Sequence, residues 1–205
     1  MNSLLVYCRP GYEADTANEL TALSTQFEVY GYPEFKSEQG YILFHFYQPG
    51  DADRLGGRLA VSETIFPRQI VVVTAHLEGL DKTNRAGPVL DAISQADTDE
   101  WKNTLLFVEH ADTEDGKALA KFCKKFIVPL RQGLRKQNAL TFKERNDGRG
   151  LHVFFTDYDN CYVGHSYPDC RSAYVDCISR VIFPPKAPSR STLDAEEAIL
   201  NILDE

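Results

Sequence analysis

The chain lacks several features that would assign it to common protein classes. No apolar run approaches the roughly 18 residues of a membrane-spanning helix, and residues 4–7 are too short for a signal-peptide core. The five cysteines form no Cys-x-x-Cys pair, which argues against a zinc site or a redox pair. No glycine-rich cofactor fingerprint follows a predicted strand. These absences favour a globular binding module with reduced thiols, which we expect to be cytoplasmic and monomeric.

The chain is acidic overall, but its basic residues are unevenly spread. Its formal net charge is −8, yet residues 116–150 hold ten of the 22 Lys and Arg and only two of the 30 Asp and Glu. The ten are Lys117, Lys121, Lys124, Lys125, Arg131, Arg135, Lys136, Lys143, Arg145 and Arg149. Because a polyanion-binding surface needs a local concentration of positive charge, these ten residues are the candidate nucleic-acid contacts.

The basic segment also has the periodicity of an amphipathic helix. At about 100° per residue, its basic residues from 117 to 136 fall on one arc. The apolar residues on the opposite arc are Leu119, Phe122, Cys123, Phe126, Ile127, Leu130 and Leu134. Pro129 predicts either a kink or two helices, with Pro129 at the first position of the second. A solvated helix face would show the same pattern, but the basic continuation to residue 149 favours phosphate contact.

The first 80 residues predict the order βαββαβ. Apolar runs predict strands at residues 4–8, 27–35, 40–47 and 68–76, and helical periodicity predicts helices at 12–24 and 49–59. The second and third strands are expected to form a hairpin. This order is that of the ferredoxin-like split βαβ unit.

Residues 81–182 predict a second unit with the order α-β-α-β-β. Its elements are a helix at 84–95, a strand at 104–108, the basic helical stretch, and strands at 152–157 and 161–166 joined by a tight turn at 158–160. Residues 183–191 are proline-rich and predict a linker, and residues 192–203 predict a helix. The expected fold class is α+β.

Two further groups of residues could carry chemistry. Phe154, Phe155 and Tyr158 could stack on bases, as aromatic residues do in single-strand binders, although strand alternation places one of the two Phe residues in the core. His165 and Ser166 with a nearby aspartate could suggest a hydrolase, but the flanking sequence matches no nucleophile elbow. We therefore assign no catalytic, cofactor-binding or metal-binding residue.

A set of segments carries a resemblance to a known family. They are CRPGYE at 8–13, FHFYQP at 44–49, IFPRQ at 65–69, ADT at 111–113, KFCKKFIVPLR at 121–131, HVFF at 152–155, and FP at 183–184 with APSRSTL at 187–193. Together they resemble the amino-terminal portion of the bacterial large-subunit rRNA 2′-O-methyltransferase M family. The resemblance extends over essentially the whole chain, and the basic-helix and APSRSTL segments are its more specific parts.

The resemblance implies a ferredoxin-like subdomain at residues 1–80 and a THUMP-type RNA-binding subdomain at 81–182. Residues 183–205 would be the linker and the first helix of a Rossmann-like methyltransferase domain that this chain lacks. The chain would be the RNA-binding portion of an S-adenosylmethionine-dependent 23S rRNA cytidine 2′-O-methyltransferase, inactive alone and without a cofactor of its own. The alternatives are a stand-alone THUMP-type RNA-binding adaptor for a separate RNA-modifying enzyme, and a small-molecule-sensing ferredoxin-like domain with a merely solvated basic stretch.

One position departs from the family pattern. Where the pattern reads Ser-Thr-Leu-Lys, and related methyltransferases use the lysine in catalysis, this chain has Asp194. Either the lysine is dispensable in this branch or the parent enzyme is altered. We assign no catalytic role to Asp194.

Overall fold

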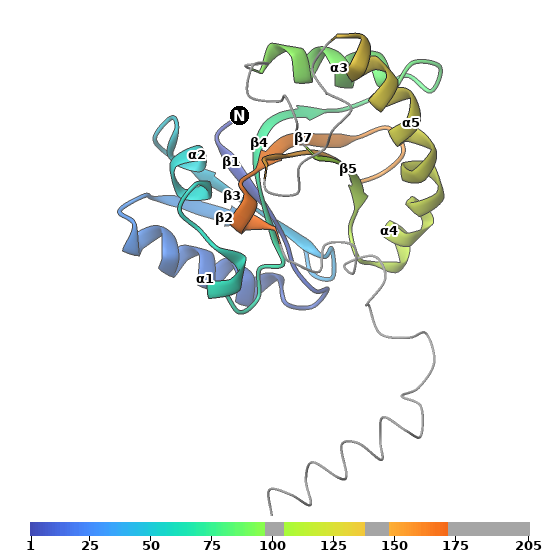
Figure 1. The fold of residues 1–205 in the computed structure, drawn as a ribbon. Helices are drawn as coiled ribbons and strands as arrows, with labels where there is room; N and C mark the ends of the chain where they lie inside the picture. Colours follow the sequence, from blue (N-terminus) through green and yellow to red (C-terminus); the bar gives the residue numbers. More distant parts are fainter. Residues whose placement is uncertain (97–104, 138–147, 172–205) are drawn as a thin grey trace, which may run out of the picture. The chain divides into compact units, whose positions relative to one another are not determined.

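The structure, a computed structural model, describes residues 1–96, 105–137 and 148–171. Their strands form one mixed sheet of seven strands in the order β2-β3-β1-β4-β7-β6-β5 (Figure 1). The predicted linker and final helix at 183–205, with Asp194, lie outside the described residues, as do Lys143 and Arg145.

The first half of the chain has the predicted βαββαβ order. Its strands pair antiparallel, with β1 between β3 and β4 and with β2 at the sheet edge. The elements are β1 (Ser3–Tyr7), α1 (Glu13–Gln26), β2 (Gly31–Glu34), β3 (Tyr41–Phe46), α2 (Asp51–Gly56) and β4 (Gln69–Leu77). The predicted hairpin is β2–β3, but β2 is shorter than predicted because the chain leaves α1 through Glu28 in a left-handed conformation, φ 56°.

The second half has the predicted α-β-α-β-β order and continues the same sheet. Strand β5 pairs parallel with β6, β6 pairs antiparallel with β7, and β7 pairs antiparallel with β4. The elements are α3 (Ala86–Gln95), β5 (Leu105–His110), α4 (Glu114–Ala118), α5 (Ala120–Lys136), β6 (Gly150–Phe155) and β7 (Cys161–Ser166). The β4–β7 pairing therefore joins the two halves through backbone hydrogen bonds.

The basic helical stretch breaks at a different place from the one predicted. Helix α5 continues through Pro129, so the expectation of a second helix starting at Pro129 is wrong. The break lies at Leu119, between α4 and α5, and α4 is capped by the Thr113 hydroxyl, which accepts from Gly116 N at 2.8 Å. Because Pro129 is exposed and the apolar face of α5 is packed on the sheet, tertiary contacts hold the helix together across the lost hydrogen bond. A kink at Pro129 stays a prediction.

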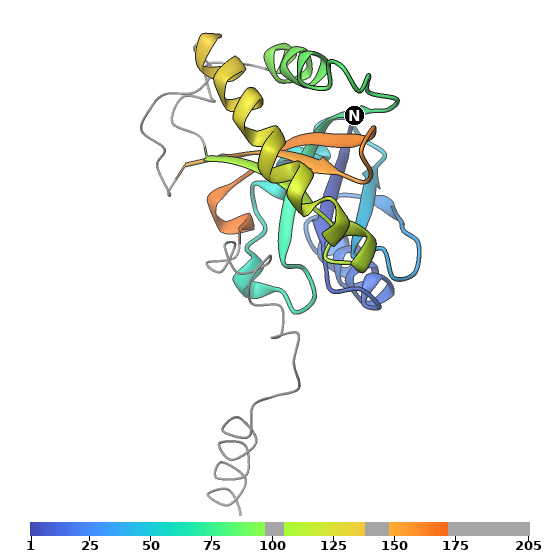
Figure 2. The same ribbon diagram turned by 90° about the vertical axis from the view of Figure 1, so that its right-hand side faces the viewer.

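The helices α1, α2, α3 and α5 all pack on one face of the sheet (Figures 1 and 2). Ile70 and Val72 of β4 belong to the core beneath α1 and α2. Val72 is paired with His165 on β7, and paired residues share a face of the sheet. Val163 and Cys161 precede His165 at two-residue spacing, so they share its face of the sheet, and both lie in the core beneath α3 and α5.

The opposite face is concave, because the sheet curls around it. Strands β1 and β5 are separated by three strands, yet Tyr7 Oη of β1 donates to Glu109 Oε2 of β5 at 2.5 Å. The ring of Tyr7 also lies 4.9 Å from that of Phe154 on β6. A third cluster of buried apolar residues fills this concave face.

A β-bulge allows β4 to contribute side chains to all three buried apolar clusters. The β4–β7 register shifts between Val73 and Ala75, leaving Thr74 as the extra residue. Val73 therefore faces the concave side, whereas Ala75 and Leu77 pack against the core beneath α3 and α5. The Thr74 hydroxyl donates to Val163 O at 3.1 Å across the irregularity.

Candidate nucleic-acid interface

Helix α5 separates its apolar and basic residues as the sequence predicts. Cys123, Phe126, Leu130 and Leu134 are buried against the sheet. The exposed lysines of the same helix are Lys121, Lys124, Lys125 and Lys136. We call these four residues the α5 lysines.

The lysines differ in the partners they have. Lys117 of α4 lies 2.7 Å from Glu114 Oε1, and this hydrogen bond raises its pKa. Both partners are exposed, so the pair contributes little to stability. Within the described part of the chain, no ion pair or hydrogen bond engages an α5 lysine side chain. Their ammonium groups are therefore available to an external anion.

The arginines of the candidate set are more enclosed. Arg131 and Arg135 are half-buried, and neither is without a partner. Arg149 lies outside the helix, immediately before β6, and its guanidinium stands 4.7 Å from the centre of the Tyr167 ring. The Tyr167 hydroxyl in turn donates to Asp53 of α2 at 2.7 Å. Among the predicted residues on helix α5, the exposed ones are thus the four α5 lysines, and Arg149 belongs to a separate contact.

The three candidate stacking residues have different environments. Phe154 and Phe155 are 1% and 0% exposed, so neither can stack on a base. Alternation predicted one of them in the core, but both are buried because helices cover one face of β6 and the curled sheet encloses the other. Tyr158 remains, with 48% of its surface exposed.

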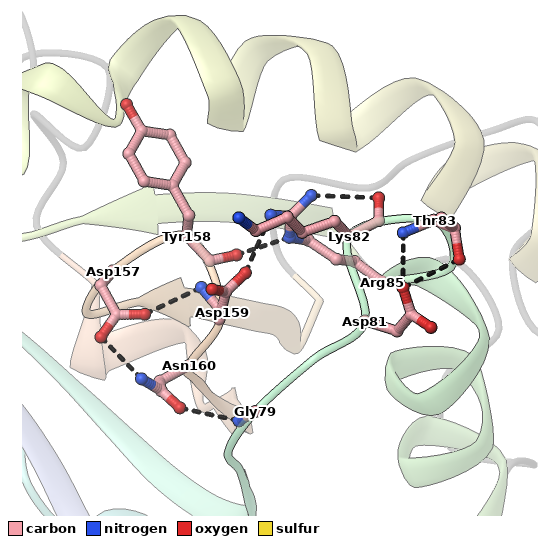
Figure 3. Close-up of polar contacts among 9 residues, drawn as sticks. All are labelled: Gly79, Asp81, Lys82, Thr83, Arg85, Asp157, Tyr158, Asp159 and Asn160. Atoms are coloured by element: carbon pink, nitrogen blue, oxygen red, sulfur yellow. Dashed lines mark hydrogen bonds and ion pairs between the residues drawn. The ribbon is translucent and has the colours of Figure 1, made fainter.

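Tyr158 sits on the predicted tight turn between β6 and β7 (Figure 3). Asp157 accepts from Asp159 N at 2.8 Å and from Asn160 Nδ2 at 2.6 Å, which is the side-chain chemistry that closes such turns. Asn160 Oδ1 accepts from Gly79 N at 2.9 Å. The turn is therefore fixed both internally and to the segment between β4 and α3.

Arg85 joins the same turn to α5. Its Nη2 lies 2.8 Å from Asp159 Oδ1, and its Nε donates to Tyr158 O at 2.6 Å (Figure 3). Its guanidinium stands 5.3 Å from the centre of the Phe122 ring of α5. Lys82, which is exposed, lies in the same segment between β4 and α3 as Arg85. The sequence analysis did not single out Arg85 or Lys82. No local pattern indicates the contact of Arg85 with Tyr158, which is 73 positions away.

A second polar group lies on the concave face and has the connectivity of a Ser-His-acid triad. His152 Nε2 is 2.7 Å from Ser166 Oγ, and His152 Nδ1 is 3.1 Å from Glu109 Oε2. Ser166 and His152 are both 0% exposed, so a substrate could not reach the hydroxyl. The suspected partner His165 points elsewhere, with Nε2 3.4 Å from Asp53 Oδ1. This network is structural.

Burial sets the state of the described cysteines. It raises the pKa of Cys8 to about 11 and those of Cys123, Cys161 and Cys170 to about 12, and all four are free thiols.

Among the described residues, no three His, Cys, Asp or Glu side chains are grouped as a metal ion would require. The helices in the described ranges include none that is long and apolar enough to span a membrane.

These features define a class: a ferredoxin-like domain whose sheet continues into a second α/β half with a basic helix on the outside. Two family models match the chain. "RlmM ferredoxin-like domain" matches residues 1–71, and "Ribosomal RNA large subunit methyltransferase M, N-terminal" matches residues 84–167. The chain belongs to the ribosomal RNA large subunit methyltransferase M family and matches its amino-terminal portion.

Full-length relatives agree with this assignment. A protein of Alteromonas mediterranea named "Ribosomal RNA large subunit methyltransferase M" is 45% identical over 201 residues, which cover 98% of this chain and 55% of the relative. A protein of the same name from Mannheimia succiniciproducens is 44% identical over 206 residues, covering 99% and 57%. The chain thus spans about half the length of the curated relatives it matches.

A solved structure, that of TrmN from Thermus thermophilus, aligns with 80% of this chain and 45% of its own, at 12% identity and a TM-score of 0.44. A likeness at this level identifies neither fold nor function.

Proposed function

We propose that this chain is the RNA-binding portion of an S-adenosylmethionine-dependent methyltransferase that modifies a cytidine 2′-hydroxyl of 23S rRNA. The name of the relatives supports an rRNA substrate, and the length of the relatives beyond the matched portion supports part of an enzyme over a stand-alone adaptor. The observation that carries the RNA-binding role is the row of exposed α5 lysines in a chain of net charge −8.

The proposal divides the chain as the sequence suggested. Residues 1–80 form a ferredoxin-like subdomain, residues 81–182 a THUMP-type RNA-binding subdomain, and residues 183–205 a linker and the start of the methyltransferase domain. The cofactor belongs to the remainder of the parent protein. This chain contributes affinity and orientation for the folded RNA.

The physical basis is phosphate neutralisation. Helix α5 has 17 residues, which at about 1.5 Å per residue extends roughly 25 Å. Lysines along that length can contact several phosphates, and each contact releases a condensed counterion. Such contacts hold the RNA in register without reading its sequence.

The first prediction follows from counterion release. With about four to six phosphates neutralised, the logarithm of the association constant should fall with the logarithm of salt concentration with a slope of about −3 to −5. Each of Lys121→Gln and Lys125→Gln should reduce the magnitude of that slope by about 0.7 to 0.9. The measurement is a salt series of binding isotherms with a 23S rRNA fragment.

The matched control is Lys36→Gln, an exposed lysine in the β2–β3 connection. It should leave both the affinity and the slope unchanged. A flat salt series for the unmodified chain would contradict the proposed function. A normal slope that Lys121→Gln and Lys125→Gln leave intact would place the RNA on another surface.

A further inference from the structure

We propose that Tyr158 is a nucleobase-stacking residue that takes an unpaired RNA base beside the α5 lysines. This inference rests on the proposed function and adds to it a contact with the base itself. Phosphate contacts accept any strand, whereas a stacked base must be unpaired or flipped out. The inference therefore names the substrate feature that this surface selects.

Tyr158 is held in place before any ligand arrives. Its ring meets the Phe122 ring edge-on, with centroids 5.4 Å apart and planes at 76°, and its hydroxyl donates to Ala118 O at 3.4 Å. Even so, 48% of the residue remains exposed. An aromatic ring that is both fixed and exposed loses little conformational entropy when a base stacks on it.

Two residues that the Tyr158 side chain contacts, Ala118 and Phe122, belong to the basic helical stretch itself. Ala118 ends α4, and Phe122 lies in the first turn of α5. Lys121 is three residues after Ala118, and Lys125 is three residues after Phe122. Phe122 and Lys125 lie on the same helix, and residues three apart on a helix are surface neighbours, so Lys125 lies beside the place where the tyrosine touches α5. Lys121 directly precedes Phe122 in the first turn of that helix.

In the turn that carries Tyr158, both carboxylates already have partners within the protein. Asp159 is ion-paired with Arg85 at 2.8 Å, and Asp157 accepts two hydrogen bonds from within the turn. Arg85 is also bonded to the backbone carbonyl of Tyr158 (Figure 3), so it positions the residue. Lys82 adds an exposed positive charge on the same connection.

Other exposed aromatic residues lie in a different setting. Tyr30, Tyr32 and Tyr47 are 50–64% exposed at the β2–β3 edge, and Tyr32 adjoins His45, which lies 2.7 Å from Glu34. A carboxylate there repels phosphate. Tyr47 therefore provides a matched control: an exposed tyrosine away from the α5 lysines.

The test compares variants of the 205-residue chain on two probes, single-stranded oligoadenylate and a paired RNA duplex of the same length. Tyr158→Ala should weaken binding to the single strand by about 5- to 100-fold, the usual effect of removing one stacking side chain, and should leave the salt slope unchanged. Tyr158→Phe and Tyr158→Trp should retain affinity because they keep a π face. Tyr47→Ala should bind like the unmodified chain.

The outcomes separate the two proposals. If Tyr158→Ala binds the single strand as tightly as the unmodified chain, or weakens duplex binding equally, the stacking inference is wrong. A flat salt series for the unmodified chain overturns the proposed function instead. Tyr158→Leu, which keeps the packing on Phe122 but removes the π face, guards against loss of folding and should match Tyr158→Ala.

Discussion

Glu109 is the residue on which the polar contacts of the concave face converge. Its carboxylate accepts from Tyr7 Oη at 2.5 Å and from Gln69 Nε2 at 3.1 Å, and lies 3.1 Å from His152 Nδ1. Burial alone would raise its pKa, but the charge and hydrogen bond of His152, with the bonds from Tyr7 and Gln69, hold the pKa below its ordinary value. Burial and the nearby Glu109 raise the pKa of Tyr7 well above its usual range.

Removing one donor from this network should be costly. Tyr7→Phe leaves the packing of the ring intact but deprives a mostly buried carboxylate of a hydrogen bond, so the free energy of unfolding should fall by about 1–3 kcal/mol. Tyr41→Phe is the control: its ring also contacts Phe154, and within the described residues its hydroxyl has no hydrogen-bond partner. That change should stay within about 0.5 kcal/mol. Chemical denaturation at neutral pH measures both.

The hydrogen bonds of Glu109 also make the stability of the protein depend on pH. Because the pKa of Glu109 is lowered in the folded state, its contribution is present above the unfolded pKa, roughly 4.3, and is lost as pH falls through the folded pKa. Glu109→Gln should therefore flatten part of the acid-side decline in stability. Parallel pH profiles for Glu109→Gln and the unmodified chain would show that Glu109 is not the linked group.

At the scale of an element, Gly164 lies where β7 packs tightly against β4. A Cβ at Gly164 would lie 2.3 Å from the Val72 carbonyl oxygen, a backbone atom that cannot move aside alone. Gly164→Ala should therefore lower the free energy of unfolding by about 1–3 kcal/mol, the usual cost of overpacking.

The control for Gly164→Ala is Gly57→Ala. There the backbone is helical, φ −74°, and an added Cβ would make only ordinary contacts, the nearest at 3.4 Å. That variant should be neutral or slightly stabilised. Thermal and denaturant unfolding of the two variants measures the difference, and equal stabilities would show that β7 can shift away from β4.

Local patterns predicted the elements but not how they meet. Strand and helix periodicities along each half suffice for the βαββαβ and α-β-α-β-β orders, since each depends on residues a few positions apart. The β4–β7 pairing, the bulge at Thr74 and the curl that buries Phe154 depend on segments far apart in sequence. The break at Leu119 was missed because Pro129 is the stronger local signal, and packing overrides it.

The same distinction applies to the candidate interface. Helical periodicity alone placed the α5 lysines on one arc, because charge and apolar residues alternate with the period of a single helix. The local concentration of basic residues grouped Arg149 with them, although Arg149 belongs to a contact with Tyr167. The turn that holds Tyr158 depends on Arg85 and Gly79, which only the folded chain brings near.

At the scale of the whole molecule, the sheet geometry decides which surfaces are available. Helices occupy the convex face, and the concave face is closed by the Tyr7–Glu109 contact and the apolar cluster around Phe154. Because the apolar side of α5 packs on the sheet, its basic side lies on the outside, and Phe122 of α5 contacts Tyr158 of the β6–β7 turn. Figure 2 shows the α5 ribbon lying across the outside of the sheet. On the proposed function, a large folded RNA would meet this surface without entering a cleft.

The last prediction concerns the cofactor: this chain alone should neither bind S-adenosylmethionine nor methylate RNA. Enzymes of the doubly wound class hold such cofactors at the carboxyl ends of parallel strands, beside a glycine-rich turn. Among the described strands only β5 and β6 are parallel, and β5 leads into α4 through Ala111, Asp112 and Thr113, with no glycine. Calorimetric titration with S-adenosylmethionine should give no saturable heat, while a full-length relative, as positive control, should bind. Micromolar binding by this chain would place a cofactor site within its own residues and overturn the proposal that it is an RNA-binding portion alone.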